Sequence, residues 1–206
     1  MMKKGLLLTA LLLALPFAAF AGSSIDFTNG GGTLSGTNSG LTLTGSTLIA
    51  ANGLGGELIT GSNLGTVSFS TGVLSSGTLQ MGGTFAAGGS FSIRGNGTGG
   101  IPNGVIFNGS FTGPVTWTLI TLGNGTHNYT LTGSLTGTWY AGGTINGATV
   151  QLTINTGRGF FNGKTTVSSG DTNFTTVPEP GTLSLLGTGL IAVGGIVRRK
   201  LQMLRG

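Results

Sequence analysis

Along most of this chain, apolar residues alternate one by one with Ser, Thr or Gln. The pattern is clearest in residues 41–44, 67–70, 91–93, 115–119, 129–132 and 149–154. A period of two puts alternate side chains on opposite faces of an extended strand, whereas a helix needs a period near 3.6. No helical period of any length appears between residues 22 and 177. We therefore expect strands with one buried face and one face in water.

Glycine-containing pairs separate these strands. Asn-Gly or Gly-Gly pairs stand at 29–30, 52–53, 55–56, 82–83, 88–89, 96–97, 103–104, 108–109, 124–125, 142–143, 146–147 and 162–163. Both residue types tolerate positive φ, so the pairs are typical of tight hairpin turns, although Asn108-Gly109, inside the run from Val105 to Phe111, could instead be a bulge. The chain is therefore predicted to be all-β, with an antiparallel β-sandwich as its fold and a barrel as the less favoured arrangement.

A β-solenoid is the other alternative, because richness in Gly, Asn and Thr also marks that class. The segment Leu43-Thr44-Gly45-Ser46 recurs as Leu131-Thr132-Gly133-Ser134, but no fixed period links other segments. Solenoids are built on such a period. The sandwich is therefore preferred.

The first residues have the layout of a secretory signal peptide. Lys3 and Lys4 precede an apolar helical run, Gly5 to Leu15, and Pro16 ends it before Ala19-Phe20-Ala21. A basic start, a short apolar core and small residues at the cleavage site define such peptides. We expect residues 1–21 to be removed after Ala21, with Ala19 and Ala21 forming the cleavage site.

The last thirty residues contain three consecutive elements. Pro178, Glu179 and Pro180 form a stiff extended peptide, because proline fixes φ and restricts the residue before it. The run from Thr182 to Val197 contains no ionisable residue and would span about 24 Å as a helix. Arg198, Arg199 and Lys200 follow it and are expected to hold the C-terminus in the cytoplasm as a membrane stop. A transmembrane helix is predicted here, with everything before Thr182 outside.

This order of Pro-Glu-Pro, apolar helix and basic terminus resembles the PEP-CTERM sorting signal of Gram-negative bacteria. The resemblance implies export through the inner membrane by the translocon, membrane anchoring by the C-terminal helix, and processing by an exosortase at the Pro-Glu-Pro motif. It also implies a final place at the cell surface or outside the cell, alongside exopolysaccharide and biofilm components. It covers only the C-terminal signal.

The chain is accordingly divided into four parts. Residues 1–21 are the signal peptide, 22–170 a Gly/Thr/Asn-rich β domain, 171–181 a linker that is flexible from Asp171 to Thr176 and contains the Pro-Glu-Pro motif, and 182–206 the transmembrane helix with its basic tail.

The formal net charge of +5 belongs to the two ends of the chain. Between the two signals the ionisable residues are few and balanced: Asp26, Glu57 and Asp171 against Arg94, Arg158 and Lys164. Nucleic acid is therefore excluded as a partner, since the basic residues serve membrane topology. The chain contains no cysteine, so disulfides do not stabilise the domain.

The sequence offers little for catalysis or metal binding. His127 is the only histidine and is expected to be an exposed loop residue. A triad or a zinc or calcium site needs clustered ligands, and the three carboxylates are widely spaced. No catalytic residue, metal site or cofactor is predicted. A hydrolase built from His127, Asp26, Glu57 and Asp171 is the least favoured hypothesis.

Carbohydrate binding is the main alternative function. Trp117 and Trp139 fall on the apolar side of their strands and are expected in the core, whereas Tyr140 should point outward and could stack on a sugar ring. The leading expectation is an exported, non-enzymatic cell-surface or extracellular-matrix β protein. A lectin-like surface module is the alternative.

Overall fold

The computed structural model describes residues 24–175, and every regular element in this range is a strand. The predicted signal peptide, the Pro-Glu-Pro motif and the predicted transmembrane helix lie outside the described residues. The strands are β1 (Ser24–Gly30), β2 (Thr33–Thr37), β3 (Gly40–Leu54), β4 (Glu57–Ser70), β5 (Leu74–Thr78), β6 (Gly82–Phe85), β7 (Gly88–Asn96), β8 (Asn103–Phe111), β9 (Val115–Thr121), β10 (His127–Trp139), β11 (Thr144–Asn155), β12 (Lys164–Thr166) and β13 (Ser169–Thr175).

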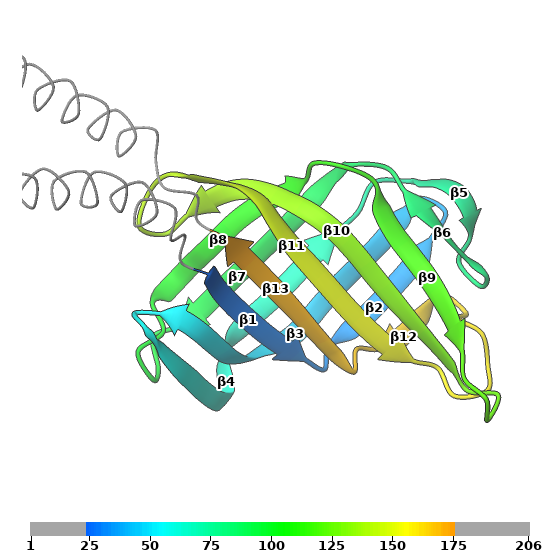
Figure 1. Cartoon of the computed structure of the whole chain (residues 1–206), viewed down its shortest axis with the longest axis horizontal. Helices are drawn as coiled ribbons and strands as arrows, with labels where there is room; N and C mark the ends of the chain where they lie inside the picture. The colour runs from blue at the N-terminus through cyan, green and yellow to red at the C-terminus, as the bar shows by residue number, and fades with distance from the viewer. Residues whose placement is uncertain (1–23, 176–206) are drawn as a thin grey trace, which may run out of the picture. The chain divides into compact units, whose positions relative to one another are not determined.

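The sheet closes on itself as an antiparallel barrel of 8 strands (Figure 1). The ring runs β11, β13, β1, β3, β4, β7, β8 and β10, and pairing of β10 with β11 completes it. The remaining strands extend the wall: β9, β6 and β5 continue from β10, while β2 and β12 continue from β3. The prediction of a β-sandwich is therefore wrong. The solenoid is wrong as well, because each pairing in residues 24–175 is antiparallel and no coil repeats.

Long, bent strands explain why a barrel forms. Strand β10 pairs with β9 through Thr132 and with β8 from Leu135 onward, so it crosses from one partner to another along its length. Between Leu135 and Thr136 the register with β11 shifts past Gly147, which has φ +80°. Such a bulge bends the strand and increases its twist. A sheet that is twisted and bent in this way pairs its first strand with its last and closes into a barrel. It does not separate into two packed layers.

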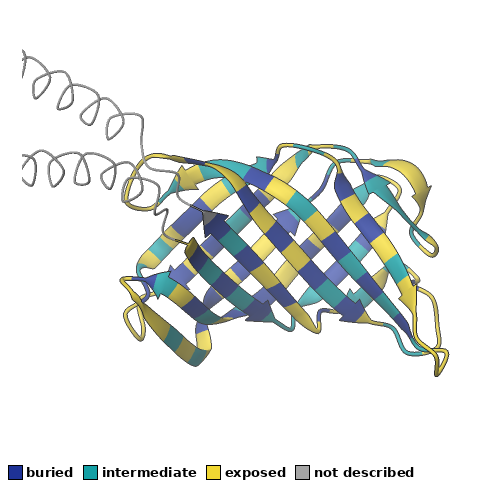
Figure 2. Cartoon of the chain, viewed as in Figure 1, coloured by how far each residue is buried: buried dark blue, intermediate teal, exposed yellow. Residues whose placement is uncertain are grey.

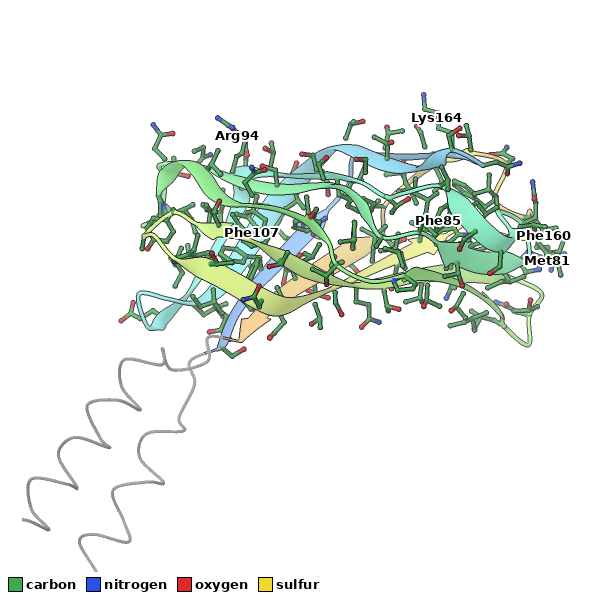
Figure 3. All side chains as sticks on the ribbon, turned by 90° about the horizontal axis from the view of Figure 1, so that it is seen from above. Met81, Phe85, Arg94, Phe107, Phe160 and Lys164 are labelled. Atoms are coloured by element: carbon green, nitrogen blue, oxygen red, sulfur yellow. The ribbon has the colours of Figure 1, made fainter. Side chains whose placement is uncertain are left out.

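Buried and exposed residues alternate along most of the strands, as the period of two predicts (Figure 2). Aromatic rings fill the interior together with Leu, Ile and Val side chains. The Phe91 ring centre lies 6.0 Å from that of Phe69 and 6.2 Å from that of Phe107, and Phe107 in turn lies 4.7 Å from Phe174. Viewed from above, Phe85 and Phe107 lie between the walls, whereas Arg94 and Lys164 point outward (Figure 3). The barrel therefore has a packed core.

Glycines inside the strands make room for these rings. A Cβ at Gly133 would lie 2.7 Å from Phe111 Cδ1, and one at Gly137 would lie 2.7 Å from Phe107 Cζ. Real Cβ atoms do not approach a ring this closely, so only glycine fits beside the aromatic side chain. From the sequence, the glycines were expected to reverse the chain in turns or, as at Asn108-Gly109, to bend it in a bulge. The structure adds this further role, in which ring and glycine face each other across neighbouring strands.

The two ends of the described domain lie together. Ser24 at the start of β1 pairs with Thr175 at the end of β13, and this defines the terminal end of the barrel. Strand β13 includes residues 171–175, which were expected from the sequence to be a flexible linker. These residues belong to the sheet because Thr172 and Phe174 are buried in the core. The opposite, far end carries the turns between β5 and β6 and between β9 and β10.

Candidate functional site

The candidate catalytic histidine is a buried structural residue. His127 begins β10 at the far end and is only 8% exposed. Its ring stacks on Phe160 at 4.3 Å between centres, and Nδ1 lies 3.3 Å from the Gly159 carbonyl oxygen. The prediction of an exposed loop histidine is wrong. The connection from β11 to β12 places Phe160 and Gly159 against the His127 ring, and the sequence around His127 does not indicate this contact.

The carboxylates are not gathered around this histidine. Glu57 begins β4 at the terminal end, at the opposite end of the barrel from His127. Within residues 24–175, no three His, Cys, Asp or Glu side chains come together as possible metal ligands. Only Asp26 and Asp171, on the adjacent strands β1 and β13, are close enough to influence each other.

Partial burial raises the pKa of the Asp26 carboxyl above its ordinary value, and the nearby Asp171 carboxylate raises it further. A backbone hydrogen bond from Phe27 opposes both effects. A raised pKa in the folded state means that the ionised form opposes folding. Its contribution to stability is therefore favourable below the unfolded pKa and is lost as the pH rises through the folded pKa.

We expect Asp26→Asn to raise the free energy of unfolding at about pH 7 and to leave it unchanged near pH 3, below the ordinary carboxyl value of 3.8. The asparagine removes the partly buried charge and its repulsion by Asp171. Urea denaturation at both pH values measures the difference. Glu57→Gln is the control, because Glu57 is exposed and distant from Asp171; an equal gain in both variants would contradict the explanation.

The aromatic candidates for sugar stacking are mostly in the core. Trp117 is 1% exposed and its Nε1–H donates to the Leu79 carbonyl oxygen at 2.9 Å, so its predicted core position is confirmed. Trp139 is partly buried and packs against Phe27 and Phe174. Tyr140 is 48% exposed, as predicted. Of the three rings, only Tyr140 offers a large surface to solvent.

The outer face of β9, β10, β11, β13 and β1 carries two cross-strand rows of polar side chains. In the first row Thr116, Thr132, Gln151, Asp171 and Thr28 are successive register partners. In the second row the partners are Ser134, Thr149, Asn173 and Asp26. We call these two rows the polar wall. Adjacent strands lie about 4.8 Å apart, so each row is a regular series of hydroxyl, amide and carboxylate groups.

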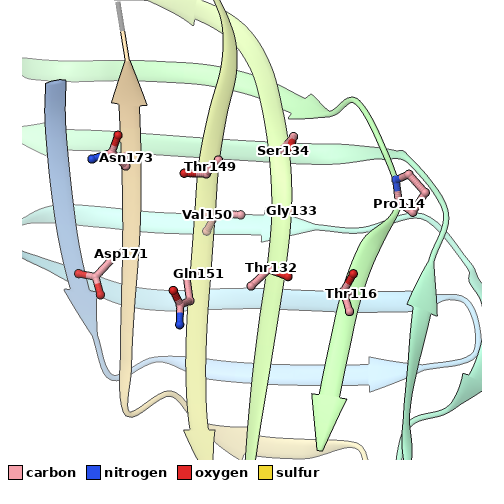
Figure 4. A pocket seen from close by; sticks show the side chains of 10 residues that line it. All are labelled: Pro114, Thr116, Thr132, Gly133, Ser134, Thr149, Val150, Gln151, Asp171 and Asn173. Atoms are coloured by element: carbon pink, nitrogen blue, oxygen red, sulfur yellow. The ribbon is translucent and has the colours of Figure 1, made fainter. Parts of the chain in front are cut away.

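A surface depression of about 500 Å³ lies on the polar wall (Figure 4). Its side chains come from both rows and from Pro114, and Gly133 and Val150 lie at its centre: Pro114, Thr116, Thr132, Gly133, Ser134, Thr149, Val150, Gln151, Asp171 and Asn173. Asp171 is the charged residue in this set. Hydroxyl and amide groups can both donate and accept hydrogen bonds, so the depression can bind a ligand with many hydroxyls.

This depression was not predicted from the sequence. Its alternating Thr and Gln residues were recognised as the wet faces of strands at 115–119, 129–132 and 149–154. Their alignment into rows depends on the register between strands. Thr116 and Asp171 belong to the same row only because three successive strand pairings are in register. No local signal in the sequence specifies that register.

The match to a known family lies in the C-terminal part of the chain. Residues 176–200 match the family model for the PEP-CTERM protein-sorting motif. The chain ends in a PEP-CTERM sorting signal. The match includes Pro178, Glu179 and Pro180 and the basic residues up to Lys200. No curated protein and no solved structure matches the chain.

A PEP-CTERM signal implies an exported protein that is anchored in the membrane before an exosortase, itself a membrane enzyme, processes it. The resemblance stated from the sequence is therefore confirmed for the C-terminal signal. The signal peptide with its cleavage site at Ala19 and Ala21 stays a prediction. In the part of the chain from 24 to 175, no helix has the length and apolar character needed to cross a membrane.

Proposed function

We propose that the protein is a non-enzymatic component of the cell surface or extracellular matrix of a Gram-negative bacterium. Its C-terminal helix anchors it in the inner membrane until an exosortase processes the PEP-CTERM signal. The β-barrel is then displayed at the surface or released, in association with exopolysaccharide and biofilm. The C-terminal sorting signal is the observation that carries this proposal.

The chemistry of the barrel supports a display role over catalysis. Its outer face is rich in Thr, Ser and Asn, and apart from the neighbouring Asp26 and Asp171 its ionisable residues are dispersed over different strands and connections. His127 has a backbone carbonyl and a phenylalanine ring as its neighbours, so no carboxylate orients it as a general base. A neutral polar surface suits a hydrated matrix.

Mass spectrometry of the mature protein tests the proposal. The protein is purified from the outer membrane, the medium and the inner membrane of cells that express the full chain. We expect an N-terminus at Gly22 and a C-terminus near Pro178 to Pro180 in the surface and medium fractions. A protein that keeps residues 1–21 in the cytosol, or that keeps Gly206 in every fraction, would contradict the proposal.

The second candidate function is carbohydrate binding, and the polar depression is the observation that favours it. The tyrosine-based version of this hypothesis depends on Tyr140 alone, because Trp117 is in the core. Tyr140 follows β10 at the terminal end and is not among the residues that line the depression. The two possible sugar contacts can therefore be separated by mutation.

A further inference from the structure

We propose that the depression on the polar wall is a binding site for an uncharged polysaccharide chain. The inference rests on the proposed function and specifies its ligand class. The nature of the side chains, their charge and their spacing each support it.

The side chains of the depression match a polyhydroxylated ligand. Thr132 and Gln151 lie opposite each other on β10 and β11, and both are exposed on the outer face. Hydroxyl groups donate and accept, and the Gln amide supplies one acceptor and two donors. A sugar hydroxyl also donates and accepts, so it can form hydrogen bonds with either the Thr hydroxyl or the Gln amide.

The charge of the depression excludes acidic ligands. No lysine, arginine or histidine lines it, and Asp171 contributes a carboxylate. A uronate, sulfate or phosphate group placed there would face this carboxylate without a neighbouring cation, and like charges repel. An uncharged sugar meets no such cost, and the Asp171 oxygens can accept hydrogen bonds from its hydroxyls. The occupant is therefore a neutral glycan.

The size and regularity of the wall suit a chain rather than a single ring. The volume of about 500 Å³ lies within the range of ligand-binding pockets, which is about 300–1,000 Å³. The first row continues beyond the depression to Thr28 on β1. Four strand spacings give a row of about 19 Å from Thr116 to Thr28, which is long enough to contact several successive sugar units.

The mutations that test the site leave the core intact. Thr132→Ala combined with Gln151→Ala removes two exposed side chains from the middle of the first row. Thr42→Ala combined with Ser68→Ala is the matched control, because Thr42 and Ser68 are exposed on β3 and β4, away from the depression. Tyr140→Ala tests the alternative contact. Near-UV circular dichroism and thermal unfolding verify that each variant is folded.

The experiment applies the full-length protein, purified in mild detergent, to an array of neutral and uronate-containing oligosaccharides, followed by titration with the neutral oligosaccharide that binds most tightly. We expect binding to neutral glycans. Loss of two hydrogen-bonding side chains should weaken it about tenfold, with no change in the control pair or in Tyr140→Ala.

Three results would overturn the inference: no neutral glycan bound, uronate glycans bound in preference, or wild-type affinity in the folded Thr132→Ala, Gln151→Ala variant. C-terminal processing is measured, by mass spectrometry of the C-terminus, in the cells from which the protein is purified. Correct processing without glycan binding rejects this inference alone, whereas an unprocessed protein retained in the inner membrane rejects the proposed function.

Discussion

Replacing Pro178, Glu179 and Pro180 together by alanine is expected to abolish C-terminal processing, so that the protein accumulates in the membrane with Gly206 still attached. The two prolines restrict the motif to an extended backbone, and Glu179 supplies its one charge. Alanine removes both features and favours continuation of a helix. The sorting enzyme then loses the shape and the charge that distinguish this peptide from any other segment before a membrane helix.

Intact-mass spectrometry and membrane fractionation measure the effect. The expected result is near-complete loss of the processed form. Val177→Ala and Thr182→Ala, which flank the motif, serve as controls and should be processed as the wild type is. If the triple variant is processed normally, the motif is not the recognition element, and the C-terminal segment acts only as an anchor.

Gly137→Ala is expected to lower the free energy of unfolding by about 3 kcal/mol, at the upper end of the cost of overpacking. Gly137 on β10 lies directly opposite Gly109 on β8, and these two strands are neighbours in the barrel. The new Cβ would lie 2.6 Å from the Gly109 Cα and would overlap the Asn108 carbonyl oxygen. Both contacts are with backbone, so no side-chain rotation relieves them.

Gly113→Ala is the matched control for this prediction. Gly113 lies between β8 and β9, and no atom lies within 4 Å of the place its Cβ would take. We expect its stability to equal or slightly exceed that of the wild type, because alanine restricts the unfolded chain. Urea denaturation of the two variants provides the comparison. Equal stability of both variants would show that the strand pairing tolerates separation at this point.

The continuation of β10 through two glycines was not predicted from the sequence. Alternation along 129–132 correctly predicted a strand, yet the strand continues as β10 to Trp139 through Gly133 and Gly137. A glycine within a strand looks like a turn signal when only neighbouring residues are considered. Its actual partners are the Phe111 and Phe107 rings, which stand far away in the sequence and adjoin it only after pairing.

The candidate site shows the same limit. The wet face of each strand was recognised, and Tyr140 was correctly predicted to point outward. His127 was expected to be exposed because its neighbours Asn124 to Asn128 are typical of a turn. The Phe160 ring that covers it comes from a connection more than thirty residues later.

Local physics thus accounts for the strands, for the face of each strand that is buried, and for the sorting signal at the C-terminus, because each depends on neighbouring residues. Closure of the sheet into a barrel, burial of His127 and alignment of Thr132, Gln151 and Asp171 into one row were decided by tertiary structure. A period of two is compatible with many registers and with open or closed sheets. The choice among them depends on residues far apart in the sequence: the register of the paired strands, the bulges that bend them and the packing of aromatic rings against glycines.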